Sequence, residues 1–265
     1  MIVLVTEKLV PSTWGTYWDH FGETLVRLLE IKEGTKVLDV GTGGGANLYP
    51  ATKRVGTKGF VTGVELCEHC VERANGEIER CKIPNAKVLL KDATETGFPD
   101  AHFDYAIAGF IGWDDYFDFK KGKFVAEDVL TKEILRVLKP GGHFGLSTWL
   151  NQEDLDWMKQ FLNSHDIECR ANYSAEHEEG WRTIMADTSL TDLRFVTEIY
   201  HYTFPTADFW WKEMMDYNWI DDKEDREVIT EDIKSSAFEA VKDHMTDDGG
   251  VRFSRTAIFM TAQKS

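Results

Sequence analysis

The stretch Lys36-Val-Leu-Asp-Val40, followed at once by Gly41-Thr-Gly-Gly-Gly45, decides the fold of this chain. Its first five residues have the apolar pattern of a short buried strand. The glycines let the backbone turn tightly and approach a ligand closely, and a helix is expected from about Ala46 with its amino terminus aimed at that ligand. Strand, glycine loop and helix in this order predict a nucleotide-like ligand at the loop.

The same alternation continues on both sides of the loop. Apolar residues three and four apart predict a preceding helix over about 13–30. Beyond the loop we expect strands at 59–65, 86–91, 103–110 and 143–149, helices at 68–81, 125–138 and 152–163, and a break at Lys139-Pro-Gly-Gly142. Strands that alternate with helices predict a parallel sheet with helices on both faces.

The tail of the chain departs from this alternation. Two strand-like runs, 193–204 and 251–262, flank a long helical stretch that contains the charge run Asp221–Glu227. The chain has 265 residues, 42% of them hydrophobic, and shows no internal repeat or linker. We therefore expect residues 1–265 to form a single domain, with an N-terminal cap helix at about 13–30 and a decorated half from about 150 to 265.

Composition limits the partners. The formal net charge of −16 disfavours a general nucleic-acid binder, because such a surface repels phosphate backbones. No apolar run reaches the roughly 20 residues that span a bilayer. The opening Met-Ile-Val-Leu-Val is too short for a signal-peptide core. We expect a cytoplasmic protein with no membrane span and no bound nucleic acid.

Cys67 and Cys70 have the C-x-x-C spacing that zinc sites and thiol redox sites use. The segment also has the pattern of a helix start, where small half-buried residues need no function. A second pair of metal ligands is hard to find nearby, although His69 lies between the cysteines. Structural packing is the favoured interpretation, and no metal is predicted.

Asp39 narrows the identity of the ligand. It lies two residues before the first glycine of the loop, at the end of the first strand. A carboxylate there repels a diphosphate but suits a ligand with positive charge, such as the ammonium and sulfonium groups of S-adenosylmethionine. The alternative is that Asp39 only caps the following turn.

Two more acids end the next two strands. Glu65 ends the second strand, where an acid accepts hydrogen bonds from ribose hydroxyls. Asp92 ends the third strand, where an acid can accept from an adenine amino group, with the Ala93 backbone available to a ring nitrogen. Three consecutive strands ending in acids, on the edge where such sheets bind ligands, form a specific pattern.

These motifs resemble those of class I S-adenosylmethionine-dependent methyltransferases. Val37-Leu-Asp-Val-Gly-Thr-Gly-Gly-Gly45 is similar to their first motif, Gly63-Val-Glu65 to their ribose motif and Lys91-Asp-Ala93 to their adenine motif. Residues 103–107 and 135–142 resemble the family's fourth strand and the turn before its fifth. The similarity covers about residues 14–150 and is closest to the ubiquinone- and menaquinone-biosynthesis group.

The resemblance implies a Rossmann-like, doubly wound sheet of seven strands, mostly parallel, with a C-terminal antiparallel hairpin. It also implies S-adenosylmethionine as the cofactor. The residues implied to contact it are Tyr17, Asp39, Gly41, Gly43, Glu65, Leu66, Asp92, Ala93 and Phe110. The expected reaction moves the methyl group to a small organic acceptor by in-line displacement.

The family has no universal catalytic residue, so none is predicted here. Aromatic residues crowd three places that border the substrate pocket in this fold, notably Ile111-Gly-Trp-Asp-Asp-Tyr-Phe-Asp-Phe119. An apolar lid is one interpretation and core packing the other, with packing preferred for Trp14 and Phe21 and the lid for Trp113, Tyr116 and Phe119. The candidate substrate residues are Trp18, His20, Trp113, Asp114, Tyr116, Trp149 and Trp211.

Other functions stay open at this point. A protein or RNA methyltransferase would share the fold, although the acidic balance disfavours RNA. An NAD-dependent oxidoreductase is disfavoured by Asp39. A non-catalytic S-adenosylmethionine-binding protein is also compatible with the motifs, because a fold does not fix a function. His20 is either a proton acceptor or an ordinary surface histidine.

Overall fold

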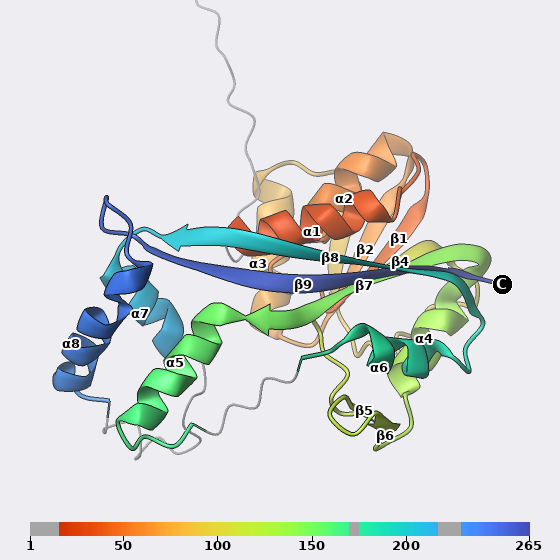
Figure 1. Ribbon diagram of the computed structural model, residues 1–265. Helices are drawn as coiled ribbons and strands as arrows, with labels where there is room; N and C mark the ends of the chain where they lie inside the picture. The colour runs from red at the N-terminus through yellow and green to blue at the C-terminus, as the bar shows by residue number, and fades with distance from the viewer. Residues whose placement is uncertain (1–15, 170–174, 217–228) are drawn as a thin grey trace, which may run out of the picture. The chain divides into compact units, whose positions relative to one another are not determined.

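The computed structural model describes residues 16–169, 175–216 and 229–265 (Figure 1). The start of the predicted cap helix, including Trp14, and the charge run 221–227 lie outside the described residues.

A seven-stranded sheet carries the fold, with the strand order β3-β2-β1-β4-β7-β9-β8. Neighbouring strands from β3 to β7 pair in parallel, and β8 and β9 form the C-terminal antiparallel hairpin. The predicted fold class is thereby confirmed. The strands are β1 (Lys36–Val40), β2 (Phe60–Glu65), β3 (Ala86–Leu90), β4 (Phe103–Gly109), β7 (Leu138–Gln152), β8 (Leu190–Phe204) and β9 (Val251–Lys264).

The described helices alternate with these strands as the apolar pattern predicts. They are α1 (Thr16–Leu28), α2 (Leu48–Val55), α3 (Glu68–Arg80), α4 (Val129–Val137), α5 (Glu153–Ser164), α6 (Glu178–Met185), α7 (Ala207–Met215) and α8 (Glu231–Ala240). The described residues also form two short 3₁₀ turns, η1 (Gly56–Lys58) and η3 (Val241–His244). A small hairpin consists of β5 (Phe117–Asp118) and β6 (Lys123–Phe124).

The two faces of the sheet bury different helices because side chains alternate along each strand. Leu38 and Val40 of β1 belong to a core cluster with Ile134 of α4 and Trp181 of α6. On the opposite face α1 and α2 pack against β4 and β1, and Tyr49 of α2 donates a hydrogen bond to a carbonyl of α3. Figure 1 shows α1 and α2 on one side of the sheet and α4 and α6 on the other.

The structure corrects two predicted boundaries. Lys139-Pro-Gly-Gly142 does not break the chain but lies inside β7, where the pairing shifts between Phe103–Leu138 and Tyr105–His143. The extra residues leave the ladder as a bulge, which tolerates a proline, and Lys139 Nζ holds them by donating to Asp104 at 2.6 Å. Helix α4 starts at 129 rather than 125, because Asp128 caps it by accepting the Thr131 N–H.

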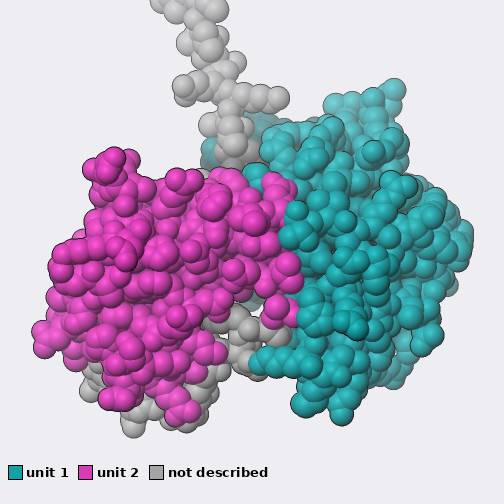
Figure 2. All heavy atoms as spheres, in the orientation of Figure 1, with its two compact units in different colours: residues 1–148, 176–197, 258–265 teal, residues 149–175, 198–257 magenta. Residues whose placement is uncertain are grey.

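Two compact units divide the chain (Figure 2). Unit 1 comprises residues 1–148, 176–197 and 258–265, and unit 2 comprises residues 149–175 and 198–257. Unit 1 holds the glycine loop and the strands β1 to β4. Unit 2 holds α5, α7 and α8, and its buried Arg255 pairs with Asp154 through Nε at 3.0 Å and Nη2 at 2.5 Å. That residues 1–265 are a single domain stays a prediction.

Two helical glycines provide a matched test of the packing of α1. A Cβ at Gly22 of α1 would lie 2.2 Å from the carbonyl oxygen of Ala46, whereas a Cβ at Gly76 of α3 would meet nothing within 4 Å. We expect Gly76→Ala to stabilise the protein by about 0.5–1 kcal/mol through helix propensity. Gly22→Ala should destabilise it by roughly 1–3 kcal/mol, because backbone cannot yield easily.

Urea unfolding of both variants and the wild type at one pH measures the two changes. Equal stabilisation by the two alanines would show that α1 does not pack this closely on the loop before α2.

Candidate functional site

The carboxyl ends of β1 to β4 meet at one edge of the sheet. In the pairing register Val40 lies opposite Val64 and Ala108, and Glu65 lies opposite Leu90. The three acids that the sequence places at the ends of strands therefore share this edge. Two backbone hydrogen bonds tie the segments that follow: Thr42 N–H donates to Val64 O at 3.1 Å, and Lys91 N–H to Glu65 O at 3.0 Å.

The glycine loop needs its glycines. Gly41, Gly43 and Gly45 have φ values of 64°, 50° and 89°, in the left-handed region that side chains disfavour. A Cβ at Gly41 would also lie 2.3 Å from the Ile111 side chain, and one at Gly45 would lie 2.4 Å from the ring of Tyr49. The loop is thus pressed between the segment after β4 and the helix α2.

Asp39 is wholly buried at 0% exposure beneath this loop. Its Oδ2 accepts the Thr42 hydroxyl at 2.9 Å, while its Oδ1 has no hydrogen-bond partner among the described residues. Burial raises the pKa of Asp39 to about 7, and the Glu65 charge adds to the rise. The Thr42 hydroxyl and the Asn47 side chain act in the opposite direction. Such a carboxylate is costly unless a cation or a donor reaches it.

Two further buried oxygens lie at the same edge without a hydrogen-bond partner in the described residues: Asn47 Oδ1 and Ser147 Oγ. Asn47 stands at the N-cap of α2 but makes no capping hydrogen bond. Its amide nitrogen would be 2.2 Å from a Cβ at Gly109, and Ser147 pairs with Gly109 in the sheet. These oxygens and Asp39 Oδ1 together offer acceptors to a ligand rich in donors.

Glycines in the strands make room for this arrangement. Gly63 lies opposite Asp39 in the register, and a Cβ there would be 2.3 Å from the Thr42 hydroxyl oxygen. Neither Gly63 nor Gly109 has a positive φ. Their role is therefore space for Thr42 and Asn47 rather than backbone freedom.

Glu65 holds the backbone around the loop. Its Oε2 accepts the Gly43 N–H at 2.9 Å, and its Oε1 accepts the N–H groups of Leu66 and Cys67 at 2.9 and 3.0 Å. Leu66, which follows, exposes 67% of its surface.

Asp92 lies in the turn after β3. Its Oδ1 accepts the N–H and the hydroxyl of Thr94 at 2.8 and 2.7 Å, which lower the pKa of the carboxyl. Ala93 packs against the core cluster. Burial raises the pKa of Tyr116, as do the charges of Asp128, Asp115 and Asp92. Tyr116 is half-buried and stays a candidate for the substrate side.

An aromatic group joins α1 to the segment after β4. The ring of Trp18 lies 5.4 Å from that of Phe110 and 5.2 Å from that of Tyr17. Phe110 has a φ of 55°, a strained value for an aromatic residue, and its N–H donates to Ser147 O at 2.7 Å. His20, half-buried on the same helix, lies 5.4 Å from Phe21. The cap helix thus reaches the strand end that carries Ser147.

Trp113 and Phe119 do not form a lid. Trp113 is 1% exposed, and its indole N–H donates to Asp128 and Thr131, both at 3.1 Å. Trp113 and Phe119 both pack against Trp181 of α6, with ring centroids 5.0 and 5.5 Å apart. The apolar residues of the segment 111–119 show no helical period because this segment leads into the hairpin of β5 and β6 rather than a helix. Asp114, between them in sequence, is exposed.

Glu176 is a site-edge residue that the sequence did not reveal. It is 4% exposed and accepts the Thr148 hydroxyl at 2.7 Å and the Trp113 N–H at 3.3 Å, next to the segment that touches Gly41. Burial raises the pKa of Glu176 to about 7, helped by the charge of Asp114. No spacing distinguishes it among the 46 acids of the chain. Only the tertiary fold brings it to this edge.

The remaining candidates, Trp149 and Trp211, belong to unit 2. Trp149 lies under the guanidinium of Arg255 at 5.2 Å, and Trp211 is buried beside Trp210 and Phe238. Their predicted role at the substrate pocket stays a prediction.

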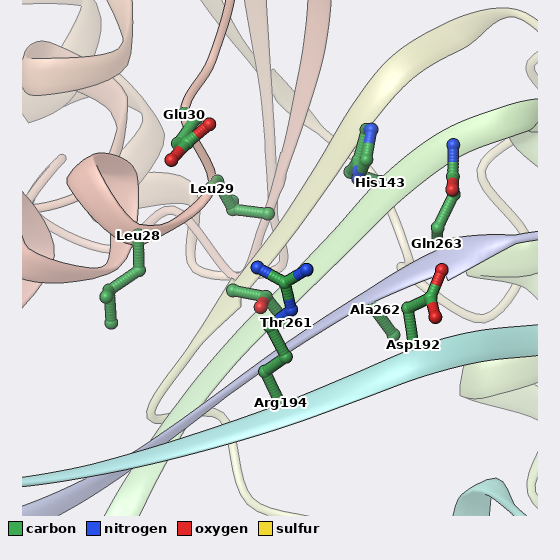
Figure 3. Close-up of a pocket in the computed structure, with 9 residues that line it drawn as sticks. All are labelled: Leu28, Leu29, Glu30, His143, Asp192, Arg194, Thr261, Ala262 and Gln263. Carbon is green, nitrogen blue, oxygen red and sulfur yellow. The ribbon is translucent and has the colours of Figure 1, made fainter.

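A cavity of about 220 Å³ lies at the opposite edge of the sheet in unit 1 (Figure 3). His143 and the residues 261–263 line it, with Asp192 and Arg194 of β8 and the end of α1. His143 pairs with Tyr105 near the start of β4, far along the strand from Gly109. The cavity is therefore separate from the glycine loop. Within residues 16–169, 175–216 and 229–265, no helix has the length and apolar character needed to cross a membrane.

Glu176 makes a testable contribution to the pH dependence of stability. Its pKa in the folded protein, about 7, lies above the ordinary 4.5, so its proton favours folding and stability falls as pH rises between these values. Glu176→Gln removes this loss. We expect the variant to exceed the wild type by roughly 1–3 kcal/mol at pH 8 and to match it near pH 4.5.

Urea unfolding at the two pH values measures the effect, with the exposed Glu179→Gln as the control. A gain from Glu176→Gln that is the same at both pH values would contradict the assignment.

Comparisons with known proteins bear on this geometry. The model of a family described as a methyltransferase domain matches residues 31–215. An aklanonic acid methyltransferase of Streptomyces sp. is 33% identical over 94 residues, 36% of this chain and 43% of that protein. A demethylmenaquinone methyltransferase of Listeria welshimeri is 28% identical over 140 residues, 53% of this chain and 55% of that protein.

These matches span about half the length of the curated relatives. Among solved structures, the YcgJ protein of Bacillus subtilis superposes with a TM-score of 0.58 at 18% identity, covering 92% of this chain and 98% of that one. This likeness concerns the fold.

Proposed function

The chain belongs to the methyltransferase domain family, and we propose that it transfers a methyl group from S-adenosylmethionine to a small organic acceptor. The observation that carries the proposal is the buried Asp39 carboxylate, with Oδ1 lacking a hydrogen-bond partner among the described residues. A ligand that brings positive charge and N–H donors to this oxygen offsets the cost of burying it.

The backbone N–H groups around the glycine loop argue against a dinucleotide as the ligand. A diphosphate at a glycine loop needs free backbone N–H groups. Here the N–H groups of Gly43, Leu66 and Cys67 all donate to Glu65. Asp39 is also buried beneath the loop, and its charge would repel a diphosphate bound there.

The residues fit S-adenosylmethionine in the following roles. Gly41 and Gly43 contact its methionine part, with Asp39 receiving the ammonium group. Glu65 holds the ribose hydroxyls, and the exposed Leu66 packs on the adenosine. The adenine contacts fall to Asp92 and Ala93, and the aromatic walls to Tyr17 and Phe110.

S-adenosylmethionine, when bound, supplies a methyl group made electrophilic by its sulfonium. The chain contributes binding, orientation and exclusion of water, which together account for much of the rate in an in-line displacement. Trp18 and Phe110 pack edge to face where Phe110 follows the end of β4. His20, Trp18, Asp114 and Tyr116 are the candidates in unit 1 for contact with the acceptor.

A small acceptor is supported by two facts. The relatives are named for aklanonic acid and demethylmenaquinone, which are small organic molecules. The net charge of −16 disfavours nucleic acid. A methyl-transfer assay with labelled cofactor over a panel of phenols, quinols and carboxylic acids identifies the acceptor class.

Calorimetry with Asp39→Asn tests the cofactor assignment. We expect the wild type to bind S-adenosylmethionine and not NAD, and Asp39→Asn to weaken that binding by at least about tenfold, or roughly 1.4 kcal/mol. The same substitution should stabilise the free protein above pH 7, because it removes a buried charge. The control is Asp100→Asn, an exposed acid before β4.

Binding of NAD but not of S-adenosylmethionine would overturn the cofactor assignment. Unchanged affinity for S-adenosylmethionine in both Asp39→Asn and Glu65→Ala would overturn the assignment of the site.

The affinity should also depend on pH. A cation favours the ionised form of Asp39, whose pKa is about 7 in the free protein. Affinity for S-adenosylmethionine should therefore rise by up to about tenfold per pH unit between pH 5.5 and 7 and level off above. Asp39→Asn should remove this slope, whereas Glu176→Gln should retain it. A slope that survives in Asp39→Asn would assign the titration to another group.

A further inference from the structure

Two cysteines at the start of α3 have an arrangement that the proposed methyl transfer does not use. Cys67 is the N-cap of α3, and its Sγ accepts the Cys70 N–H at 3.3 Å. The Cys70 thiol donates to the same sulfur, and the two sulfur atoms are 2.6 Å apart. That is only about 0.6 Å longer than a disulfide bond.

The surroundings favour redox chemistry over a metal or simple packing. In the described part of the chain no group of three His, Cys, Asp or Glu side chains could hold a metal ion. Cys67 is exposed and Cys70 half-buried, so a small reagent reaches the pair. The remaining cysteines differ: Cys81 follows the far end of α3, and Cys169 is buried.

We propose that Cys67 and Cys70 are a redox modification site, which forms a reversible disulfide within the folded protein. The site lies at the edge of the loop that Glu65 holds, because the Cys67 N–H donates to Glu65 Oε1 at 3.0 Å.

The reaction needs an oxidant, and a low-molecular-weight disulfide such as oxidised glutathione supplies it. The exposed Cys67 thiolate attacks one glutathione sulfur, forming a mixed disulfide and releasing one glutathione thiolate. Cys70 then loses its proton to solvent, and its thiolate attacks Cys67 Sγ and expels the second glutathione. Two protein thiols are oxidised and one glutathione disulfide is reduced to two thiols.

The order of the two cysteines follows from their environments. Burial raises the pKa of Cys70 to about 11, and the Cys67 sulfur and Glu65 add to the rise while Arg73 opposes it. A thiol with so high a pKa is a poor first nucleophile, so the attack on the oxidant begins at Cys67.

Mass spectrometry of the whole chain tests the proposal without any ligand, so its outcome is independent of the methyltransferase assignment. Reduced protein is incubated with oxidised and reduced glutathione at pH 8, alkylated in urea so that buried thiols react, and digested with trypsin. Both cysteines lie in the peptide 59–73, between Lys58 and Arg73. We expect this peptide to lose two hydrogens and resist alkylation, while Cys81 and Cys169 are alkylated.

A comparison with the unfolded chain separates the contribution of the fold to disulfide formation from that of the C-x-x-C spacing alone. At a fixed glutathione ratio, the disulfide should be at least about tenfold more favoured in the native protein than in urea, because the fold brings the sulfurs together. Cys70→Ser should stop at a glutathione adduct on Cys67, and Cys81→Ser should oxidise as the wild type. A native peptide 59–73 that stays fully alkylated, or a disulfide no more favoured than in urea, would overturn the proposal.

Discussion

A carboxylate buried at the end of a central strand is the constraint on which the rest of the site depends. Asp39 lies between β2 and β4, opposite Gly63 and Ile107, so the sheet itself removes it from water. One oxygen is satisfied by Thr42, and the other has no hydrogen-bond partner among the described residues. Folding therefore bears the cost of this charge, and a cationic ligand offsets it. The glycine loop covers this carboxylate. The identity of the ligand therefore depends on Asp39 as well as on the glycines.

Acidic side chains also organise the loops around that centre. Glu65 gathers backbone N–H groups from the glycine loop and from the start of α3. Glu176 joins the segment after β4 to the end of β7 through Trp113 and Thr148. In the protein itself, Glu65 accepts three backbone N–H groups, and Glu176 accepts one backbone N–H and one hydroxyl. This pattern gives rigid walls to a site that is built largely from loops.

The sequence predicted those features that local pattern and topology determine together. Strands β1 to β4 and the acids at their ends follow from apolar runs and from the parallel order, so Asp39, Glu65 and Asp92 share an edge as expected. The bulge at Lys139-Pro-Gly-Gly142 escaped prediction because Asp104 stabilises it from another strand. The burial of Trp113 and the position of Glu176 were not predicted, for one reason. Their hydrogen-bond partners lie far away in the sequence, so no local sequence pattern indicates these contacts.

Two strand glycines, Gly63 opposite Asp39 and Gly109 at the end of β4, restrict how this sequence can change over evolutionary time. The space that a methyl group would fill at Gly63 already holds the Thr42 hydroxyl, and the space at Gly109 holds the Asn47 amide. A larger residue at 63 or 109 requires a smaller residue at 42 or 47, respectively. Substitutions within each pair must therefore occur together. Gly76, Gly122, Gly141 and Gly249 have open space instead, so no such steric pairing restricts them. Covariation across relatives should therefore connect 63 with 42 and 109 with 47.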